Sequence, residues 1–133
     1  MNAWYKQVIE TLFEPTDITC AALIKDKALL KQGEKKVVHV FAPSERMLSE
    51  NAFNYLNQAN QQGYSVYVGM NPFKNHLDGV CDGRTEENVA RIKRLYADAD
   101  DNGVEVFEKL KASTALPQPH IATPFRAPPA RFR

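Results

Sequence analysis

VVHVFAPSERMLSENAFNYLNQANQQGYSVYVGM, residues 37–70, contains two apolar, β-branched segments on either side of a helical pattern. The segments are Val37–Ala42 and Tyr64–Met70, and short runs of this composition between turn-forming residues indicate buried strands. Between them, Ser44 is placed to cap a helix that ends near Gly63. One face of this helix is apolar: Leu48, Ala52, Tyr55, Leu56 and Ala59. The order strand, helix, strand predicts a sheet that is covered by helices.

The flanking sequence continues this alternation. Apolar residues at helical spacing predict a helix over Asn2–Leu12, whereas Ile18–Leu30 fits a helix or a strand equally well. After a turn-rich loop, Thr85 predicts the start of another helix, because two glutamates follow it where the helix dipole favours anions. A helix at Val104–Lys111 and a strand at His120–Thr123 complete the expected elements. The sequence therefore predicts an α/β or α+β domain.

Composition restricts the class of protein. The chain has 133 residues, of which 44% are hydrophobic and 25% charged, and this fits one folded domain. No apolar run is long enough to cross a membrane, and the N-terminus lacks the pattern of a signal peptide. Cys20 and Cys81 have no metal-binding or disulfide-framework spacing, so we expect reduced thiols in a cytoplasmic protein.

The charge and the prolines are unevenly distributed. The formal net charge is +1, which does not by itself indicate a nucleic-acid-binding protein. Residues 125–133 are rich in proline and arginine, and we expect an extended or disordered tail there. The predicted organisation is one domain over residues 1–124 followed by this tail.

The segment Leu95–Asp100, LYADAD, alternates acidic with small apolar residues. If it is a strand, Asp98 and Asp100 share one face and lie about 6.6 Å apart along it. Carboxylate oxygens suit Mg²⁺, and metals held by such acids promote displacement at phosphorus. Spacing alone therefore makes Asp98 and Asp100 candidate metal ligands.

Two other interpretations of this segment stay open. In a structural interpretation, Asp100 or Asp101 caps the following helix, and Asn102 and Gly103 form a turn. In a calcium-binding interpretation, the residues at 98, 100, 102 and 103 match the first, third, fifth and sixth positions of an EF-hand loop. That match fails at the twelfth position, where Lys109 replaces the bidentate glutamate.

Three blocks of the sequence together resemble a known family. They are residues 56–72, the segment Arg84–Val89 (RTEENV) and LYADAD. In order and spacing they resemble the N-terminal half of the RepB-type DNA primase domain, over about residues 8–123. This domain belongs to the archaeo-eukaryotic primase superfamily and occurs in replication proteins of plasmids, phages and mobile elements.

The resemblance implies an RNA-recognition-like sheet flanked by helices and template-directed nucleotidyl transfer with Mg²⁺ or Mn²⁺. The partners would be a DNA template and nucleotides, and Asp98 and Asp100 would be the catalytic, metal-binding acid pair. The family's later small-x-His motif and third acid are missing, because the chain runs from His120–Pro124 into proline-rich sequence. We therefore expect a partial primase domain that is inactive alone.

The alternative is a non-catalytic nucleic-acid-binding or protein-binding module with a structural acidic turn. A partial domain would also expose a sheet edge, through which two copies could pair.

Other polar residues are weaker candidates. Asn71, Lys74 and Arg84 are predicted nucleotide or DNA contacts, with a turn and solvated loop charges as the alternative for each. His39 lies within an apolar strand, which indicates a buried, hydrogen-bonded histidine rather than a ligand. Residues 31–36 are expected to form a solvated turn.

Overall fold

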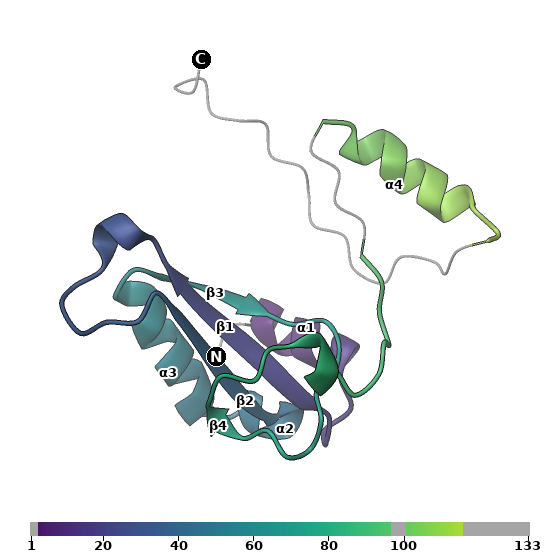
Figure 1. Cartoon of the computed structure of the whole chain (residues 1–133). Helices are drawn as coiled ribbons and strands as arrows, with labels where there is room; N and C mark the ends of the chain where they lie inside the picture. The colour runs from purple at the N-terminus through teal and green to yellow at the C-terminus, as the bar shows by residue number, and fades with distance from the viewer. Residues whose placement is uncertain (1–2, 97–100, 116–133) are drawn as a thin grey trace. The chain divides into compact units, whose positions relative to one another are not determined.

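A four-stranded antiparallel sheet forms the centre of the fold (Figure 1). The computed structural model describes residues 3–96 and 101–115. The strands lie in the order β3-β1-β2-β4. Their bounds are β1 Ile18–Lys25, β2 Val37–Pro43, β3 Tyr64–Val68 and β4 Gly79–Val80. The predicted α+β class is confirmed.

Strand β1 lies in the middle and pairs with a neighbour on both sides. In the register, Ala22 is opposite His39 of β2 on one side and opposite Tyr67 of β3 on the other. Seven of its eight residues are buried. Side chains that point to either face of β1 are buried, so its sequence shows no alternation. This explains why the pattern at Ile18–Leu30 fitted both a helix and a strand.

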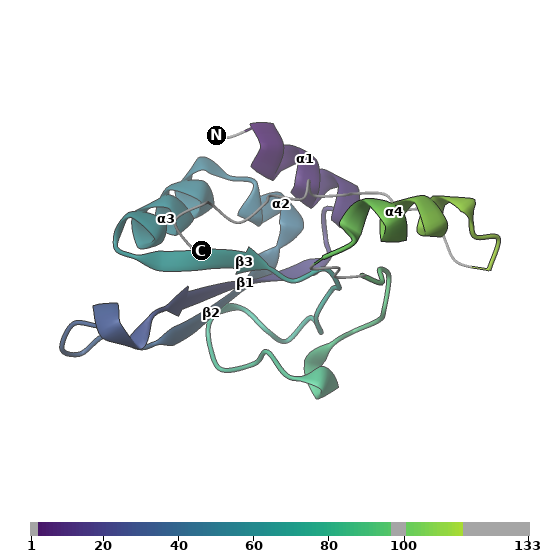
Figure 2. The ribbon, with the colours of Figure 1, turned by 90° about the horizontal axis from the view of Figure 1, so that it is seen from above.

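Three helices cover one face of the sheet (Figure 2). They are α1 Ala3–Leu12, α2 Ser44–Met47 and α3 Glu50–Gln61. The single helix predicted from Ser44 is in fact two, because Ser49 caps a new helix by accepting a hydrogen bond from the Ala52 amide at 3.2 Å. The Ser44 hydroxyl instead donates to the Glu14 carbonyl at 2.9 Å.

The core under these helices joins β1, β2 and β3 to α2 and α3. Its buried members are Ala21, Leu23, Ala42, Met47, Leu56, Ala59 and Tyr64. Tyr5 of α1 packs against this cluster, donates a hydrogen bond to the Met47 carbonyl at 2.7 Å, and has its pKa raised to about 12 by burial. Trp4 of the same helix is 53% exposed, because Tyr5, Ile9 and Leu12 form the face that packs.

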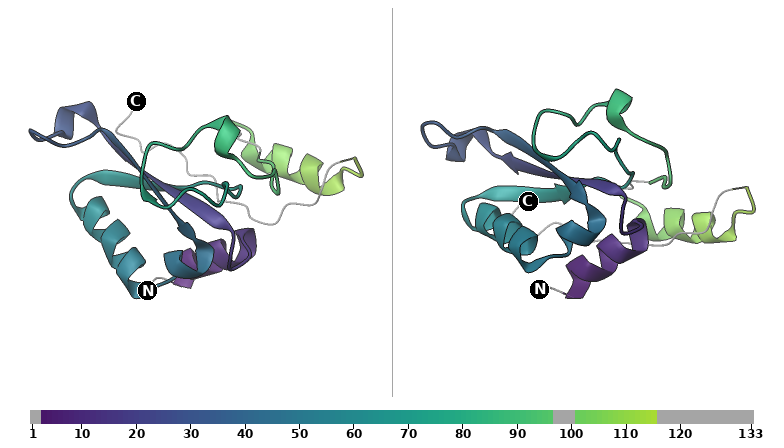
Figure 3. Two further views of the ribbon diagram at one scale, coloured as in Figure 1. Left: turned by 60° about the horizontal axis from the view of Figure 1, so that its bottom comes forward. Right: turned by 90° about the horizontal axis from the view of Figure 1, so that it is seen from below.

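The segment after β3 crosses the opposite face of the sheet, so that part of the sheet is covered on both sides (Figure 3). It forms a second core of Ile18, Cys20, Phe41, Phe73 and Leu77. The Phe41 and Phe73 rings meet edge to face with centroids 5.2 Å apart, and the Phe73 amide donates to the Ile18 carbonyl at 2.8 Å. Both cysteines are free, and burial raises the pKa of Cys20 to about 11.

The helix predicted from Thr85 was wrong. Only a short 3₁₀ turn forms, Glu86–Asn88, and the Thr85 side chain makes no capping hydrogen bond. Residues 89–96 have no regular secondary structure. The apolar residue Val89 packs on the second core, so tertiary contacts hold this segment extended over the sheet.

The strand predicted over Leu95–Asp100 is absent from its first two residues, and Tyr96 is 78% exposed. The remaining four residues lie outside the described part of the chain, as do the predicted strand at His120–Thr123 and the tail at 125–133.

The chain divides into two compact units, residues 1–95 and 96–133. In the second unit, the helix predicted over Val104–Lys111 is confirmed as α4, Gly103–Ala112. Within residues 3–96 and 101–115, no helix has the length and apolarity needed to span a membrane.

Candidate functional site

Asn71 holds the segment that leads toward the acidic cluster. Its side-chain oxygen accepts hydrogen bonds from the amides of Lys93 at 2.7 Å and Arg94 at 2.8 Å. Its side-chain nitrogen donates to the Arg94 carbonyl at 3.2 Å. These three bonds use the amide group within the chain itself, so they favour a positioning role for Asn71 over the predicted nucleotide contact.

Asp17 also holds the segment that contains Lys93 and Arg94. Its carboxylate, which is 5% exposed, accepts hydrogen bonds from Arg91 at 2.5 Å and Lys93 at 2.9 Å. The Glu14 amide donates to it at 2.9 Å. Burial by itself raises the pKa of Asp17, but the hydrogen bonds from Glu14, Lys93 and Arg91 outweigh it and lower the pKa below its ordinary value of 3.8. Residues 91–94 are therefore anchored immediately before LYADAD.

We expect the Asp17 ion pairs to make stability depend on pH in the acid range. Because the folded-state pKa lies below the unfolded-state value, their contribution is present above about pH 3.9 and is lost as the pH falls through the folded-state pKa. Urea unfolding of the unmodified chain and of Asp17→Asn measures this. Their free energies of unfolding should differ at pH 7 and converge toward pH 2. A difference that is constant between these values would contradict the assignment.

Lys74 and Arg84 remain available for a phosphate. Both are exposed, and neither side chain forms a hydrogen bond or ion pair with another residue in the described ranges. The Lys74 amide donates to the Asn88 carbonyl at 2.8 Å, which fixes the backbone of this loop. The charge of Arg84 acts on Cys20, which places it near the second core. Within the described ranges, no hydrogen bond or ion pair joins the side chain of Lys74 or Arg84 to Asn71.

Asp98 and Asp100 lie outside the described residues, so their geometry stays a prediction. Asn102 occupies the N-cap position of α4 without a side-chain capping bond, and Asp101 is exposed. The calcium interpretation is not supported, because α4 begins at Gly103 and occupies positions six to twelve of the supposed loop. The two charged residues that disagreed with that motif, Glu105 and Lys109, form an ion pair of 3.0 Å along the helix. Within the described residues, no three His, Cys, Asp or Glu side chains are grouped as a metal site.

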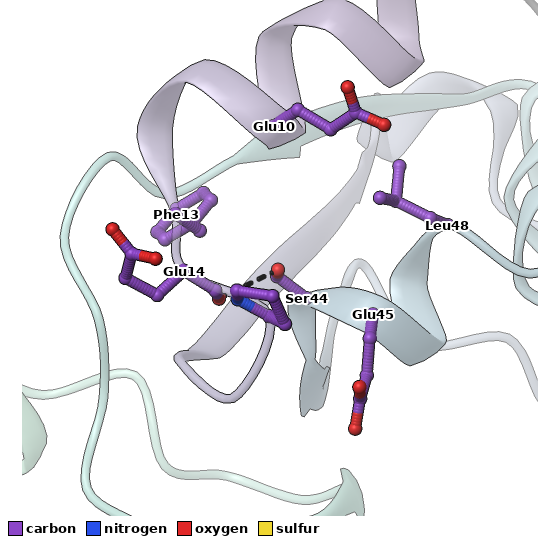
Figure 4. A pocket seen from close by; sticks show the side chains of 7 residues that line it. Glu10, Phe13, Glu14, Ser44, Glu45 and Leu48 are labelled. Atoms are coloured by element: carbon purple, nitrogen blue, oxygen red, sulfur yellow. Dashed lines mark hydrogen bonds between the residues drawn. The ribbon is translucent and has the colours of Figure 1, made fainter.

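A pocket of about 330 Å³ lies between the end of α1 and the start of α2 (Figure 4). Its lining includes the apolar residues Phe13 and Leu48 and three acidic residues, Glu10, Glu14 and Glu45. Three carboxylates with no cation among the lining residues repel phosphate groups. The pocket therefore does not fit a nucleotide, and none of the predicted site residues lines it.

Sequence reasoning missed the anchoring role of Asp17, Arg91 and Lys93. Their ion pairs join residues 74 and 76 positions apart, and a local sequence pattern cannot predict such a contact.

Comparison of the chain with protein-family models, with curated proteins and with solved structures finds no match.

Proposed function

We propose that this chain is a DNA replication protein related to primases, in which Asp98 and Asp100 bind Mg²⁺ or Mn²⁺ and, through the metal, nucleotide phosphates. Oxygen ligands suit these ions, which keep coordination positions for phosphate oxygens. The chain's own residues supply the acid pair and a backbone anchored before it, and the metal supplies the positive charge that stabilises phosphate chemistry.

The observation that carries the proposal is the arrangement of β1, β2, α3 and β3. Strands β2 and β3 are both antiparallel to β1, which lies between them, so they run parallel to each other and are connected through helices. This is a split β-α-β unit, the building block of ferredoxin-like sheets. It agrees with the RNA-recognition-like sheet that the primase resemblance implies.

The anchoring of residues 91–94 supports the proposal independently of the topology. Five hydrogen bonds join the side chains of Asn71 and Asp17 to this segment. Asn71 bonds to its backbone, and Asp17 bonds to the side chains of Arg91 and Lys93. A metal site needs its ligands held on a fixed backbone. A structural acidic turn would not need the preceding residues to be fixed in this way.

The proposed activity is binding, not primer synthesis by this chain alone. We propose that the chain binds metal and nucleic acid in the cytoplasm, where its free cysteines suit a reducing compartment, and does not synthesise primers alone. Template-directed transfer requires metals, phosphate-binding groups and a positioned template together. The non-catalytic nucleic-acid-binding module remains the second candidate, favoured by the exposed side chains of Lys74 and Arg84, which form no ion pair within the described ranges.

Titration with Mn²⁺ tests the acid pair. We expect millimolar Mn²⁺ to broaden the NMR resonances of residues 96–101, because two carboxylates without a third acid hold a divalent ion weakly. The variant Asp98→Asn, Asp100→Asn should lose this broadening, whereas Asp101→Asn, the matched control, should keep it. Broadening that survives in the double variant would show that Asp98 and Asp100 do not bind the metal.

A further inference from the structure

Among the described residues of the first unit, residues 3–95, half of the sheet face opposite the helices is left open. The segment 70–96 covers the half that contains Cys20 and Phe41, while the half toward the β1–β2 hairpin extends beyond it (Figure 2). Residues two apart in a strand share a face, so the side chains at 22 and 39 lie on the same face as Cys20 and Phe41. The next two rows of this face are Tyr67–Ala22–His39 and Ser65–Ile24–Val37.

These rows form a surface that we call the open face: Ala22, Ile24, Val37, His39, Ser65 and Tyr67. Its exposed members are Val37, Ser65 and Tyr67, whereas Ile24 and His39 are half-buried and Ala22 is buried. The Tyr67 side chain is 55% exposed and Val37 is 39% exposed. His39 is only half-buried, so the expectation of a fully buried, hydrogen-bonded histidine was wrong. Its Nδ1 atom is buried without a hydrogen-bond partner among the described residues.

The hairpin beside the open face is basic. Residues 25–37 contain five lysines against Asp26 and Glu34, a net charge of +3. Lys25 is buried and paired with Glu34, which leaves four exposed lysines: Lys27, Lys31, Lys35 and Lys36. None of these four forms an ion pair with another residue of the described part of the chain.

We infer that the open face and the basic hairpin bind single-stranded nucleic acid. Tyr67 stacks on a base, the neighbouring apolar residues cover its edge, and the hairpin lysines contact the backbone phosphates. Exposed aromatic rings beside cations are the usual means of holding single strands, because every base presents a flat π-face and every nucleotide an anionic phosphate. If the chain is the proposed replication protein, the bound strand is the template. The identification of the strand as a template rests on the proposed function, whereas the binding of a single strand does not.

The combination of groups favours a single strand over other anionic partners. A duplex keeps its bases stacked on one another and offers no face to Tyr67. An acidic polypeptide would meet the lysines without using the ring. Stacking is worth about 1–3 kcal/mol per base, so loss of Tyr67 should weaken binding about 5-fold to 150-fold.

The probe is a fluorescein-labelled 15-nucleotide oligo(dT), followed by fluorescence anisotropy at low salt in EDTA. We expect Tyr67→Ala to weaken binding at least 5-fold, while Tyr67→Phe stays within 2-fold of the unmodified chain. The matched control is Tyr55→Ala, because Tyr55 is 45% exposed on α3, in the helical layer. The variant Lys35→Gln, Lys36→Gln should reduce the slope of log K against log salt by about 1.4, or about 0.7 for each phosphate contact.

Equal affinity of Tyr67→Ala and the unmodified chain would overturn the inference. So would a 15-base-pair duplex that binds as tightly as oligo(dT), or polyglutamate that competes as well as unlabelled oligo(dT). EDTA removes divalent metal, so this result is independent of Asp98 and Asp100. Failure here with an intact Mn²⁺ titration would reject the open face alone, and the converse would reject the metal proposal alone.

Discussion

Replacement of Phe41 by alanine should destabilise the first unit by about 3–5 kcal/mol, the range measured for deletion of a buried phenylalanine ring. Phe41 is fully buried and packs against Phe73 across the sheet surface. The neighbouring backbone cannot simply close the cavity, because Gly83 is already so tight that an added Cβ would lie 2.6 Å from Leu77. Urea unfolding measures the effect, as a lower midpoint with little change in slope.

The control for this substitution is Val80→Ala on the neighbouring strand. Val80 is 63% exposed, so its truncation should change stability by no more than about 0.5 kcal/mol. A loss below about 1 kcal/mol in Phe41→Ala would show that the segment 70–96 does not pack on the sheet. The open face would then extend over the whole sheet surface.

Replacement of Lys25 by alanine should cost about 2 kcal/mol, the second largest effect that we expect. Lys25 is 2% exposed, and its ammonium group donates to both carboxylate oxygens of Glu34 at 2.9 and 3.0 Å. It also lies 5.1 Å from the centre of the Tyr64 ring. The substitution removes the packed aliphatic stem and leaves Glu34 without its cation. Thermal and urea unfolding should both report the loss.

A second variant separates packing from charge at this position. The double variant Lys25→Met, Glu34→Gln keeps most of the stem and leaves no unpaired charge. Replacement of both members of a buried ion pair by uncharged side chains is often nearly neutral, so we expect it within about 1 kcal/mol of the unmodified chain. The control Lys27→Ala concerns an exposed lysine of the same hairpin and should be neutral. Equal losses in Lys25→Ala and in the double variant would show that the ion pair, and not the stem, stabilises the hairpin.

The sequence correctly predicted those helices and strands whose local residue pattern favours the same structure as their tertiary contacts. Val37–Ala42 and the first five residues of the predicted strand Tyr64–Met70 are in strands, because their β-branched and aromatic residues suit a sheet. The helix α1 was predicted from its helical spacing. The segment from Thr85 was mispredicted for a physical reason. Its acidic first turn favours a helix, but the contacts of Phe73 and Val89 with the sheet hold the chain extended.

The candidate site was less predictable than the fold. Asn71 was singled out from its place after a strand, and only the structure shows that its amide binds the backbone of Lys93 and Arg94. No sequence pattern around Asp17 indicated its anchoring role, because its partners Arg91 and Lys93 lie far along the chain. The hairpin lysines were taken for a solvated turn, since sequence spacing does not show that the hairpin lies next to the exposed rows that contain Tyr67.

The central place of β1 has a consequence during synthesis on the ribosome. β1 is the first strand to be made, and β2 follows after a short hairpin, so this pair can form early. The partner on the other edge, β3, is not synthesised until α2 and α3 have been added. During that interval the nascent chain presents an unpaired apolar strand edge, the feature that other chains join most readily. The sheet of this protein is therefore most vulnerable to aggregation before residue 68 has left the ribosome.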